Sequence, residues 1–225
     1  MIALRDFAGA IVDRGYQIGQ QVRNALVRPD PAGRYPGGEL APVVILPGVY
    51  ETWQFMRLIA DHLNWMGHPV HLLTELGYNN RSIPETAVIA QRYLDQHDLS
   101  EVVLVAHSKG GLIGKHMIVD DLAGRIEQLI AVNSPFNGSA LARWSPNPTL
   151  RAFSPRDLTL TALAANLKAN SRITSIYSRR DPLIPGGSRL EGATNIELPM
   201  VGHFRPLASR ELLVVIDGVL GHPSR

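Results

Sequence analysis

Residues 102–112 read Val-Val-Leu-Val-Ala-His-Ser-Lys-Gly-Gly-Leu. The four apolar residues at the start predict a buried strand, and the glycine pair opens an apolar helix. Ser108 lies at the junction, with the small residues Ala106 and Gly110 on either side at two-residue spacing. Small residues there suit a turn too tight for larger side chains, a turn that lifts a serine out of a sheet. The stretch therefore predicts a nucleophile elbow, with alanine where the motif usually has its first glycine. An ordinary loop serine is the alternative.

The composition is that of one globular domain. The chain has 225 residues, of which 45% are hydrophobic and 19% are charged, enough for a single hydrophobic core. No apolar run approaches the roughly 20 residues that a membrane span requires. The first ten residues lack a basic stretch followed by a continuous apolar run, so we expect no secretory signal and a cytoplasmic protein. The oligomeric state stays open.

Cysteine and charge content exclude several kinds of chemistry. The absence of cysteine excludes disulfides, thiolate metal sites and a cysteine nucleophile. A formal net charge of +2 gives no reason to expect nucleic-acid binding. The glycine pair after Ser108 does not belong to a G-x-G-x-x-G dinucleotide fingerprint, and the scattered histidines lack metal-ligand spacing. We expect neither a metal ion nor a cofactor.

The chain divides into two regions near residue 42. Residues 2 to about 27 carry apolar side chains at near-helical spacing, and the segment Arg28–Pro42 holds four prolines and three glycines. Residues 1–41 are therefore predicted to form an amphipathic helix and an extended arm. We expect the helix to pack on the sheet edge, with subunit pairing or membrane contact as alternatives. Residues 42–225 form the second region.

Short and long apolar segments alternate through the second region. Short runs typical of buried strands lie at Val43–Leu46, Val70–Leu73, Val102–Ala106, Ile126–Val132, Ile173–Tyr177 and Ile196–Met200. Segments that predict helices lie at Trp53–Met66, Pro84–His97, Gly111–Leu122, Leu158–Ala169 and Ala208–Leu220. This order predicts an α/β fold with a mostly parallel sheet of about six strands and helices on both faces. Functional loops of such a sheet lie at the carboxyl ends of its strands.

Two residues downstream of Ser108 complete a candidate triad. A serine hydroxyl needs a base to take its proton, and the base needs an acid to orient it. His203 directly follows the last predicted strand, whereas His116 lies inside a predicted helix and His222 near the chain end. Asp181 follows the strand Ile173–Tyr177 and is the expected acid. Asp157 and Glu191 remain alternatives for that role.

The loop after the first strand is expected to stabilise the oxyanion that forms when an ester carbonyl is attacked. Backbone N–H groups serve this purpose, and one comes from the residue after the nucleophile, Lys109. The second is expected from Pro47-Gly48-Val49-Tyr50, where Gly48 permits close backbone approach. Val49 is our choice of donor, with Tyr50 as the alternative. A simple Pro-Gly turn would explain the same residues without a function.

The chain resembles α/β-hydrolases of the small bacterial class 2, or lipase A-like, type over about residues 42–221. The motifs that carry the resemblance are Leu46-Pro47-Gly48-Val49, Gly77-Tyr78-Asn79-Asn80, Val105-Ala106-His107-Ser108-Lys109-Gly110-Gly111, Asn133-Ser134-Pro135-Phe136-Asn137-Gly138-Ser139, Asp181 and Gly202-His203. Alanine before the elbow is usual in that family. The resemblance implies an α/β-hydrolase fold, with Ser108 as nucleophile, Asp181 as acid, His203 as base and the amides of Val49 and Lys109 as oxyanion donors.

The chain departs from the family pattern around this expected site. Pro47 and Tyr50 stand where such lipases usually show His and Gly. Lys109 replaces the usual apolar or His side chain beside the nucleophile, and its cation is a candidate for tuning substrate charge.

Residues 140–161 form a long connection where related hydrolases insert a lid or acyl-pocket wall. Trp144 and Phe153 are candidates to line an acyl chain, together with Tyr50; an ordinary connection that packs its own aromatic residues is the alternative.

Between residues 140 and 190, the sequence holds eight Arg and Lys residues but only two Asp residues. This excess suggests attraction to an acidic substrate or peripheral contact with an anionic lipid surface. A solvated basic surface without a partner is the alternative.

The sequence therefore predicts a serine hydrolase that cleaves carboxylic esters, a lipase or esterase that works through an acyl-enzyme. Two alternatives remain open. One is a thioesterase or amidase that uses the same three residues. The other is a non-catalytic binding protein that keeps the fold.

Overall fold

The computed structural model describes residues 13, 15, 17–19, 35 and 37–222. Six strands form one sheet in the order β2-β1-β3-β4-β5-β6, and every neighbouring pair is parallel. The strands are β1 (Val43–Leu46), β2 (Val70–Leu72), β3 (Val102–His107), β4 (Ile126–Val132), β5 (Ile173–Arg180) and β6 (Thr194–Val201). Most of the predicted N-terminal helix and arm lies outside the described residues.

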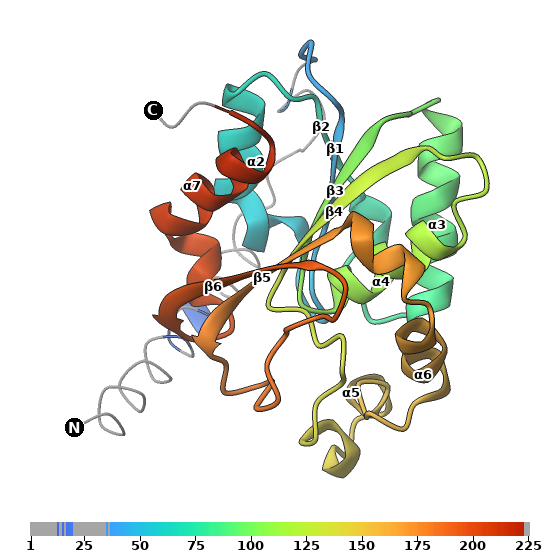
Figure 1. Cartoon of the computed structure of the whole chain (residues 1–225), viewed down its shortest axis with the longest axis vertical. Helices are drawn as coiled ribbons and strands as arrows, with labels where there is room; N and C mark the ends of the chain where they lie inside the picture. The colour runs from blue at the N-terminus through green and yellow to red at the C-terminus, as the bar shows by residue number, and fades with distance from the viewer. Residues whose placement is uncertain (1–12, 14, 16, 20–34, 36, 223–225) are drawn as a thin grey trace.

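Helices cover both faces of this sheet. Figure 1 shows α2 (Arg57–Trp65) and α7 (Arg210–Val219) on one side, and α3 (Ile83–Gln96), α4 (Lys109–Val119) and α6 (Leu158–Ala165) on the other. Among the described residues, no helix combines the length and apolar character needed to cross a bilayer.

Strands β1 and β3 and the later part of β4 bury both of their faces, which explains their apolar sequences. Ile45, Val105 and Ile130 are register partners in β1, β3 and β4, and they pack in the same core cluster as Ile59 of α2 and Ile216 of α7. The alternate residues of these strands, such as Leu104, pack in a second cluster with α3 and α4. Side chains alternate between the two faces of a strand, so a run without polar residues fills both layers.

Several elements differ in extent from their predicted bounds. The predicted helix Trp53–Met66 begins with a separate 3-10 turn, η1 (Trp53–Met56). After α6, the rest of the predicted helix Leu158–Ala169 gives way to the 3-10 turn η4 (Lys168–Arg172). Strand β5 runs on to Arg180 because β6 pairs with it as far as Arg180 and Val201. Main-chain pairing, which apolar patterning does not report, extends that strand.

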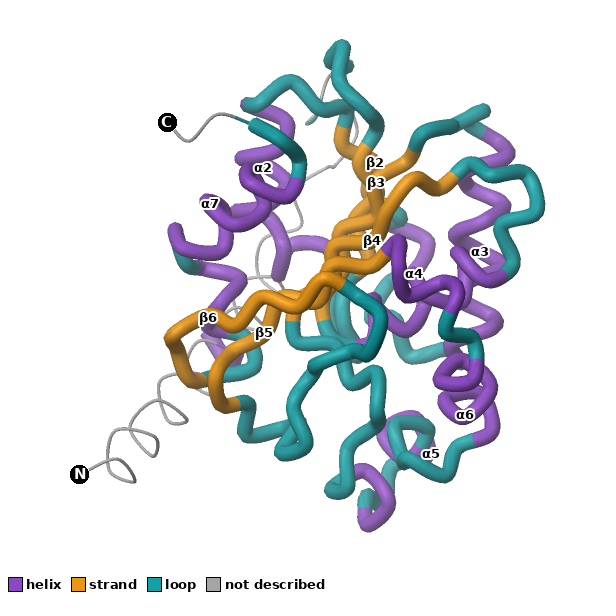
Figure 2. Tube along the Cα trace, viewed as in Figure 1, coloured by secondary structure: helices purple, strands orange, loops and turns teal. Residues whose placement is uncertain are grey.

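The remaining short elements lie in connections. They are η2 (Thr74–Leu76), η3 (Ala142–Trp144), α5 (Pro148–Arg151) and η5 (Arg205–Ala208). Figure 2 shows loops gathered beneath the carboxyl ends of the strands, with α5 beyond them. The turn after β3, the loop after β1 and the loops after β5 and β6 therefore meet at one edge of the sheet.

Two glycines after Ser108 let α4 pack closely on the sheet. A Cβ atom at Gly110 would lie 2.0 Å from the carbonyl oxygen of Leu46 at the end of β1. A Cβ atom at Gly111 would lie 2.0 Å from Ser134 Oγ. Both distances are far below van der Waals contact, so the elbow keeps its position only if these two residues lack side chains.

We expect Gly110→Ala to lower the free energy of unfolding by about 2 kcal/mol, because the new methyl group would force α4 away from β1. Urea unfolding measures the change. Gly218→Ala in α7 is the matched control, since nothing lies within 4 Å of a Cβ atom there. It should raise stability by up to about 1 kcal/mol. Equal stabilities of the two variants would contradict the close packing at Gly110.

Candidate active site

Ser108 joins β3 to α4 in an unusual backbone conformation, with φ of 51° and ψ of −117°. A non-glycine residue in such a region costs of order 1–3 kcal/mol and persists only where its surroundings hold it. Its amide N–H donates to the carbonyl oxygen of Val132 at 2.9 Å, which ties the turn to the end of β4. The turn presents the hydroxyl group of Ser108 at the carboxyl edge of the sheet.

A chain of hydrogen bonds runs from Ser108 through His203 to Asp181. The distance from Ser108 Oγ to His203 Nε2 is 2.9 Å, and the distance from His203 Nδ1 to Asp181 Oδ2 is 2.6 Å. When Nδ1–H donates to Asp181, Nε2 is free to accept the hydroxyl proton of Ser108. The structure thus brings together three residues that the sequence predicts from the ends of β3, β5 and β6.

The second oxygen of Asp181 is also bound. Asp181 Oδ1 accepts the amide N–H groups of Leu183 at 2.8 Å and Ile184 at 3.2 Å. Burial alone would raise the pKa of Asp181, but the adjacent His203 and these two amides hold it below its ordinary value. Asp181 is therefore suited to stay ionised and to orient His203.

The ring of His203 lies among several carboxylates. Burial alone would lower its pKa, but the carboxylates of Asp181, Glu51 and Asp13 together raise it above its ordinary value. A histidine in this environment takes up a proton readily, because the neighbouring carboxylates stabilise the resulting imidazolium.

His107 and Asn133 bind the carbonyl oxygen of His203. His107 Nε2 lies 3.0 Å from it, and Asn133 Nδ2 donates to it at 2.8 Å. His107 Nδ1 lies 2.9 Å from Glu51 Oε1. His107 thus bridges the side chain of Glu51 and the main chain of His203.

Glu51 lies in the loop after β1 and connects His107 to the main chain of that loop. Its Oε2 accepts the amide N–H of Gly48 at 2.9 Å, and its side chain would clash with any Cβ atom at position 48. From the other side, Asn79 Nδ2 donates to the carbonyl oxygen of Pro47 at 2.7 Å. The loop expected to supply an oxyanion donor is therefore held by two buried polar side chains.

The side chain of Lys109 extends to the loop after β2. Its Nζ donates to Asn79 O at 2.8 Å, to Asn79 Oδ1 at 3.2 Å and to the carbonyl oxygen of Arg81. Burial lowers the pKa of Lys109 to about 8, an effect that the charge of Glu85 partly opposes. This ammonium group anchors the loop after β2, which differs from the role in tuning substrate charge suggested by its sequence position.

Within the part of the chain that the structure describes, the amide N–H groups of Val49 and Lys109 have no hydrogen-bond partner. Lys109 directly follows Ser108, and Val49 lies in the loop after β1, as expected for oxyanion donors. Tyr50 has a positive φ of 58°, and its hydroxyl accepts a hydrogen bond from Asn147 Nδ2 at 2.7 Å. Tyr50 thus joins this loop to residues 140–161.

The remaining predicted residues lie in contrasting surroundings. Trp144 is 76% exposed, and the guanidinium group of Arg143 lies 4.5 Å from its ring centroid. Phe153 is buried in the core cluster of α3 and α4. Asp157 caps α6 by accepting the amides of Thr159 and Leu160, and Glu191 is exposed.

No described group of three His, Asp or Glu side chains has the arrangement of a metal site. A cavity of about 770 Å³ opens beside Asp181, lined in part by Tyr177, Arg179, Arg189 and Glu197. Neither Ser108 nor His203 lines it.

The residues that support the hydrogen-bonded chain of Ser108, His203 and Asp181, above all Glu51 and Asp13, were not predicted from the sequence. Glu51 is a single charged residue after the Pro-Gly turn, and nothing in the sequence distinguishes it from an exposed charged residue. Asp13 lies in the N-terminal region and has no local motif. His107 and Asn79 fall within motifs that were singled out, but their partners come from distant parts of the chain.

Solved structures share this arrangement of strands and helices at low sequence identity. An extracellular α/β-hydrolase from a Paenibacillus species is 17% identical, with a TM-score of 0.58 over 82% of this chain and 100% of that chain. An enol-lactonase from Burkholderia xenovorans is 16% identical, with a TM-score of 0.58 over 82% and 94% of the two chains. A metagenome-derived lipolytic enzyme is 16% identical, with a TM-score of 0.57 over 83% and 94%.

No protein-family model matches the chain, and no curated protein matches its sequence. At such low identities the structural likeness shows the fold alone. The prediction of an α/β-hydrolase fold is thereby confirmed, with a six-stranded, all-parallel sheet covered by helices on both faces.

Proposed function

We propose that the protein is a serine hydrolase that cleaves carboxylic esters through an acyl-enzyme, with Ser108 as nucleophile, His203 as base and Asp181 as orienting acid. The observation that carries the proposal is the hydrogen-bonded chain of Ser108, His203 and Asp181 at the carboxyl ends of three strands. The backbone conformation of Ser108 supports it, because strain of this kind is typical of reactive residues.

In the proposed reaction, Ser108 Oγ attacks the ester carbonyl carbon while His203 Nε2 takes the hydroxyl proton. His203 then gives that proton to the departing alcohol, which leaves an acyl group on Ser108. A water molecule, deprotonated by His203, cleaves this second ester and releases the carboxylic acid. The amides of Val49 and Lys109 stabilise the negative oxygen in both steps, an effect of about 3 kcal/mol for each donor.

The substrate class rests partly on the resemblance to lipase A-like enzymes. We assign the hydrolase domain to residues 42–225 and the N-terminal helix and arm to residues 1–41. The hydrogen bond from Asn147 to Tyr50 supports a role for residues 140–161 as a wall of the acyl site. We propose that the buried Phe153 lines the inner side of that wall and the exposed Trp144 its outer side.

A thioesterase or amidase would use the same residues, and rates on matched oxygen, sulfur and nitrogen acyl substrates distinguish these activities. A binding protein without catalysis is the remaining alternative. The direct contact between Ser108 and His203 favours an enzyme, because binding alone gives no reason for a base beside a serine.

We expect Ser108→Ala to abolish hydrolysis of p-nitrophenyl esters and Asp181→Asn to lower kcat by about 10³ to 10⁴. In the second variant, the side-chain oxygen of the introduced amide would still accept the N–H groups of Leu183 and Ile184, so the loop would be retained. The NH₂ group of that amide would donate to His203 Nδ1, which places the remaining ring proton on Nε2 and leaves no base for Ser108. Steady-state kinetics across acyl chain lengths measures both variants.

Asp157→Asn is the control, since Asp157 caps α6 without contacting His203. It should retain wild-type kcat. A fully active Asp181→Asn would contradict the proposed acid and transfer the role to Asp157 or Glu191.

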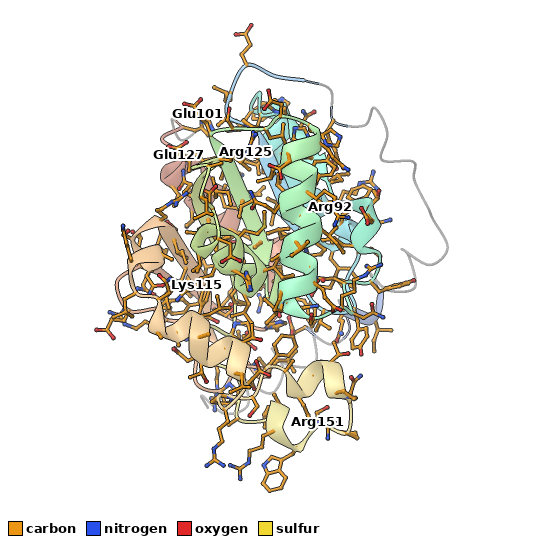
Figure 3. The ribbon with its side chains drawn as sticks, turned by 90° about the vertical axis from the view of Figure 1, so that its right-hand side faces the viewer. Arg92, Glu101, Lys115, Arg125, Glu127 and Arg151 are labelled. Atoms are coloured by element: carbon orange, nitrogen blue, oxygen red, sulfur yellow. The ribbon has the colours of Figure 1, made fainter. Side chains whose placement is uncertain are left out.

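We also propose that residues 141–158 contact anionic lipid at the membrane surface. This segment exposes three basic and three apolar side chains, which are Arg143, Arg151, Arg156, Leu141, Trp144 and Leu158. Figure 3 shows Arg151 at one end of the molecule, opposite the end that carries Glu101 and Glu127. Exposed aromatic groups beside basic groups suit a negatively charged lipid surface.

The double variant Arg143→Glu/Arg151→Glu should weaken binding to phosphatidylglycerol vesicles by at least about tenfold. Binding to phosphatidylcholine vesicles should be weak for both proteins, and added salt should reduce the difference. Vesicle co-sedimentation measures these affinities. The control is Arg92→Glu, which reverses a charge on α3 outside the segment. Equal binding to the two lipids would contradict the proposed contact with anionic lipid.

A further inference from the structure

A buried carboxylate from the N-terminal region binds the main chain that carries His203. Asp13 is only 5% exposed. Its Oδ2 accepts the amide N–H of His203 at 2.9 Å, and its Oδ1 accepts those of Phe204 at 2.7 Å and Arg205 at 2.8 Å. Three consecutive amide groups thus converge on one side chain, although 190 residues separate Asp13 from His203.

Gly202 makes room for this carboxylate. Its φ is 133°, and a Cβ atom at this position would lie 2.6 Å from Asp13 Oδ1. The carbonyl oxygen of His203 is bound from the opposite direction by His107 and Asn133. The main chain of His203 is therefore fixed at both its N–H and its C=O, and Asp13 supplies the first of these constraints.

We propose that Asp13 is a positioning residue for hydrolysis, whose carboxylate holds His203 in reach of Ser108 and stabilises the imidazolium that forms during the reaction. This inference rests on the proposed function of His203 as base. It makes the N-terminal region part of the active site, although the fold of residues 42–222 contains the whole sheet and all three triad residues.

Electrostatics distinguishes this role from a purely mechanical anchor. The titratable and charged groups around His203 are Asp181 after β5, Glu51 after β1, His107 at the end of β3, Asp13, and Arg205 on its own loop. Burial lowers the pKa of His203, whereas the charges of Asp181, Glu51 and Asp13 raise it. Loss of the Asp13 charge should therefore lower this pKa.

The direction of the pH effect follows from the role of the base. Below its pKa, His203 is protonated and cannot accept the proton of Ser108, so kcat/KM falls on the acid side of its pH profile. If removal of the Asp13 charge lowers that pKa, the acid limb moves to lower pH. A mere loss of packing would reduce stability without a shift in this direction.

The test compares Asp13→Asn, Asp13→Ala and Asp13→Glu in the full-length protein. We expect Asp13→Asn and Asp13→Ala to lower kcat about tenfold with little change in KM, because a misplaced base slows chemistry without removing a substrate contact. Their acid limbs should lie below that of the wild type. Asp13→Glu retains the charge, so its acid limb should stay closer to that of the wild type.

Asp121→Asn is the matched control. Asp121 also accepts two backbone amides, from Arg125 at 2.9 Å and Ile126 at 3.0 Å, but it does so at the start of β4. Figure 3 shows Arg125 at the end of the molecule away from α5. Asp121→Asn should lower stability and leave the pH profile unchanged. Unchanged kcat and pH profiles in Asp13→Asn and Asp13→Ala would overturn the proposal, whatever their stability.

Hydrogen exchange of the wild-type protein provides a test that needs no variant. The amides of His203, Phe204 and Arg205 should exchange as slowly as those of β3, since each donates to a buried carboxylate. Rapid exchange at these three positions would overturn the proposal even if every Asp13 variant failed to fold. An inactive wild-type protein with slow exchange would instead reject the proposed hydrolase function.

Discussion

The close contact between the first turn of α4 and the end of β1 is the constraint on which the candidate site depends. Gly110 lies against Leu46, and Gly111 lies against Ser134, at distances that exclude any side chain. This contact holds Ser108 in its costly backbone conformation and sets Lys109 beside the loop after β1. A local packing requirement thus determines where the Ser108 hydroxyl lies relative to the loop after β1.

Around this turn, the structure neutralises and fixes several buried charges. Glu51 and His107 pair with each other, and they bind Gly48 on one side and His203 on the other. Lys109 is surrounded by carbonyl oxygens of the loop after β2. Buried charges of this kind are costly unless fully hydrogen-bonded, and here each one ties a loop of the site to its neighbour. The loops after β1, β2 and β6 are therefore held by buried polar contacts as well as by apolar packing.

The sheet and the order of the three triad residues could be predicted because both leave local signals. Continuous apolar runs mark strands buried on both faces, such as β1 and β3, and Asp181 and His203 each follow a predicted strand. The support of the site leaves no local signal. Asp13 and His203 are distant in sequence, and Glu51 looks like a surface residue until it is buried against His107. The ends of β5 and β6 were also missed, because strand pairing rather than side-chain pattern extends them. The sequence made the Lys109 cation a candidate for tuning substrate charge, and only the fold reveals that its ammonium group binds Asn79.

Covalent labelling shows whether Ser108 is the activated nucleophile that we propose. A fluorophosphonate probe reacts with serines that an adjacent base activates. Peptide mapping of the labelled, folded protein should find one adduct, on Ser108, and the adduct should be lost when the protein is unfolded in urea before labelling. The absence of an adduct on Ser108 in the folded protein, or labelling that survives unfolding, would mean that the folded surroundings do not activate Ser108.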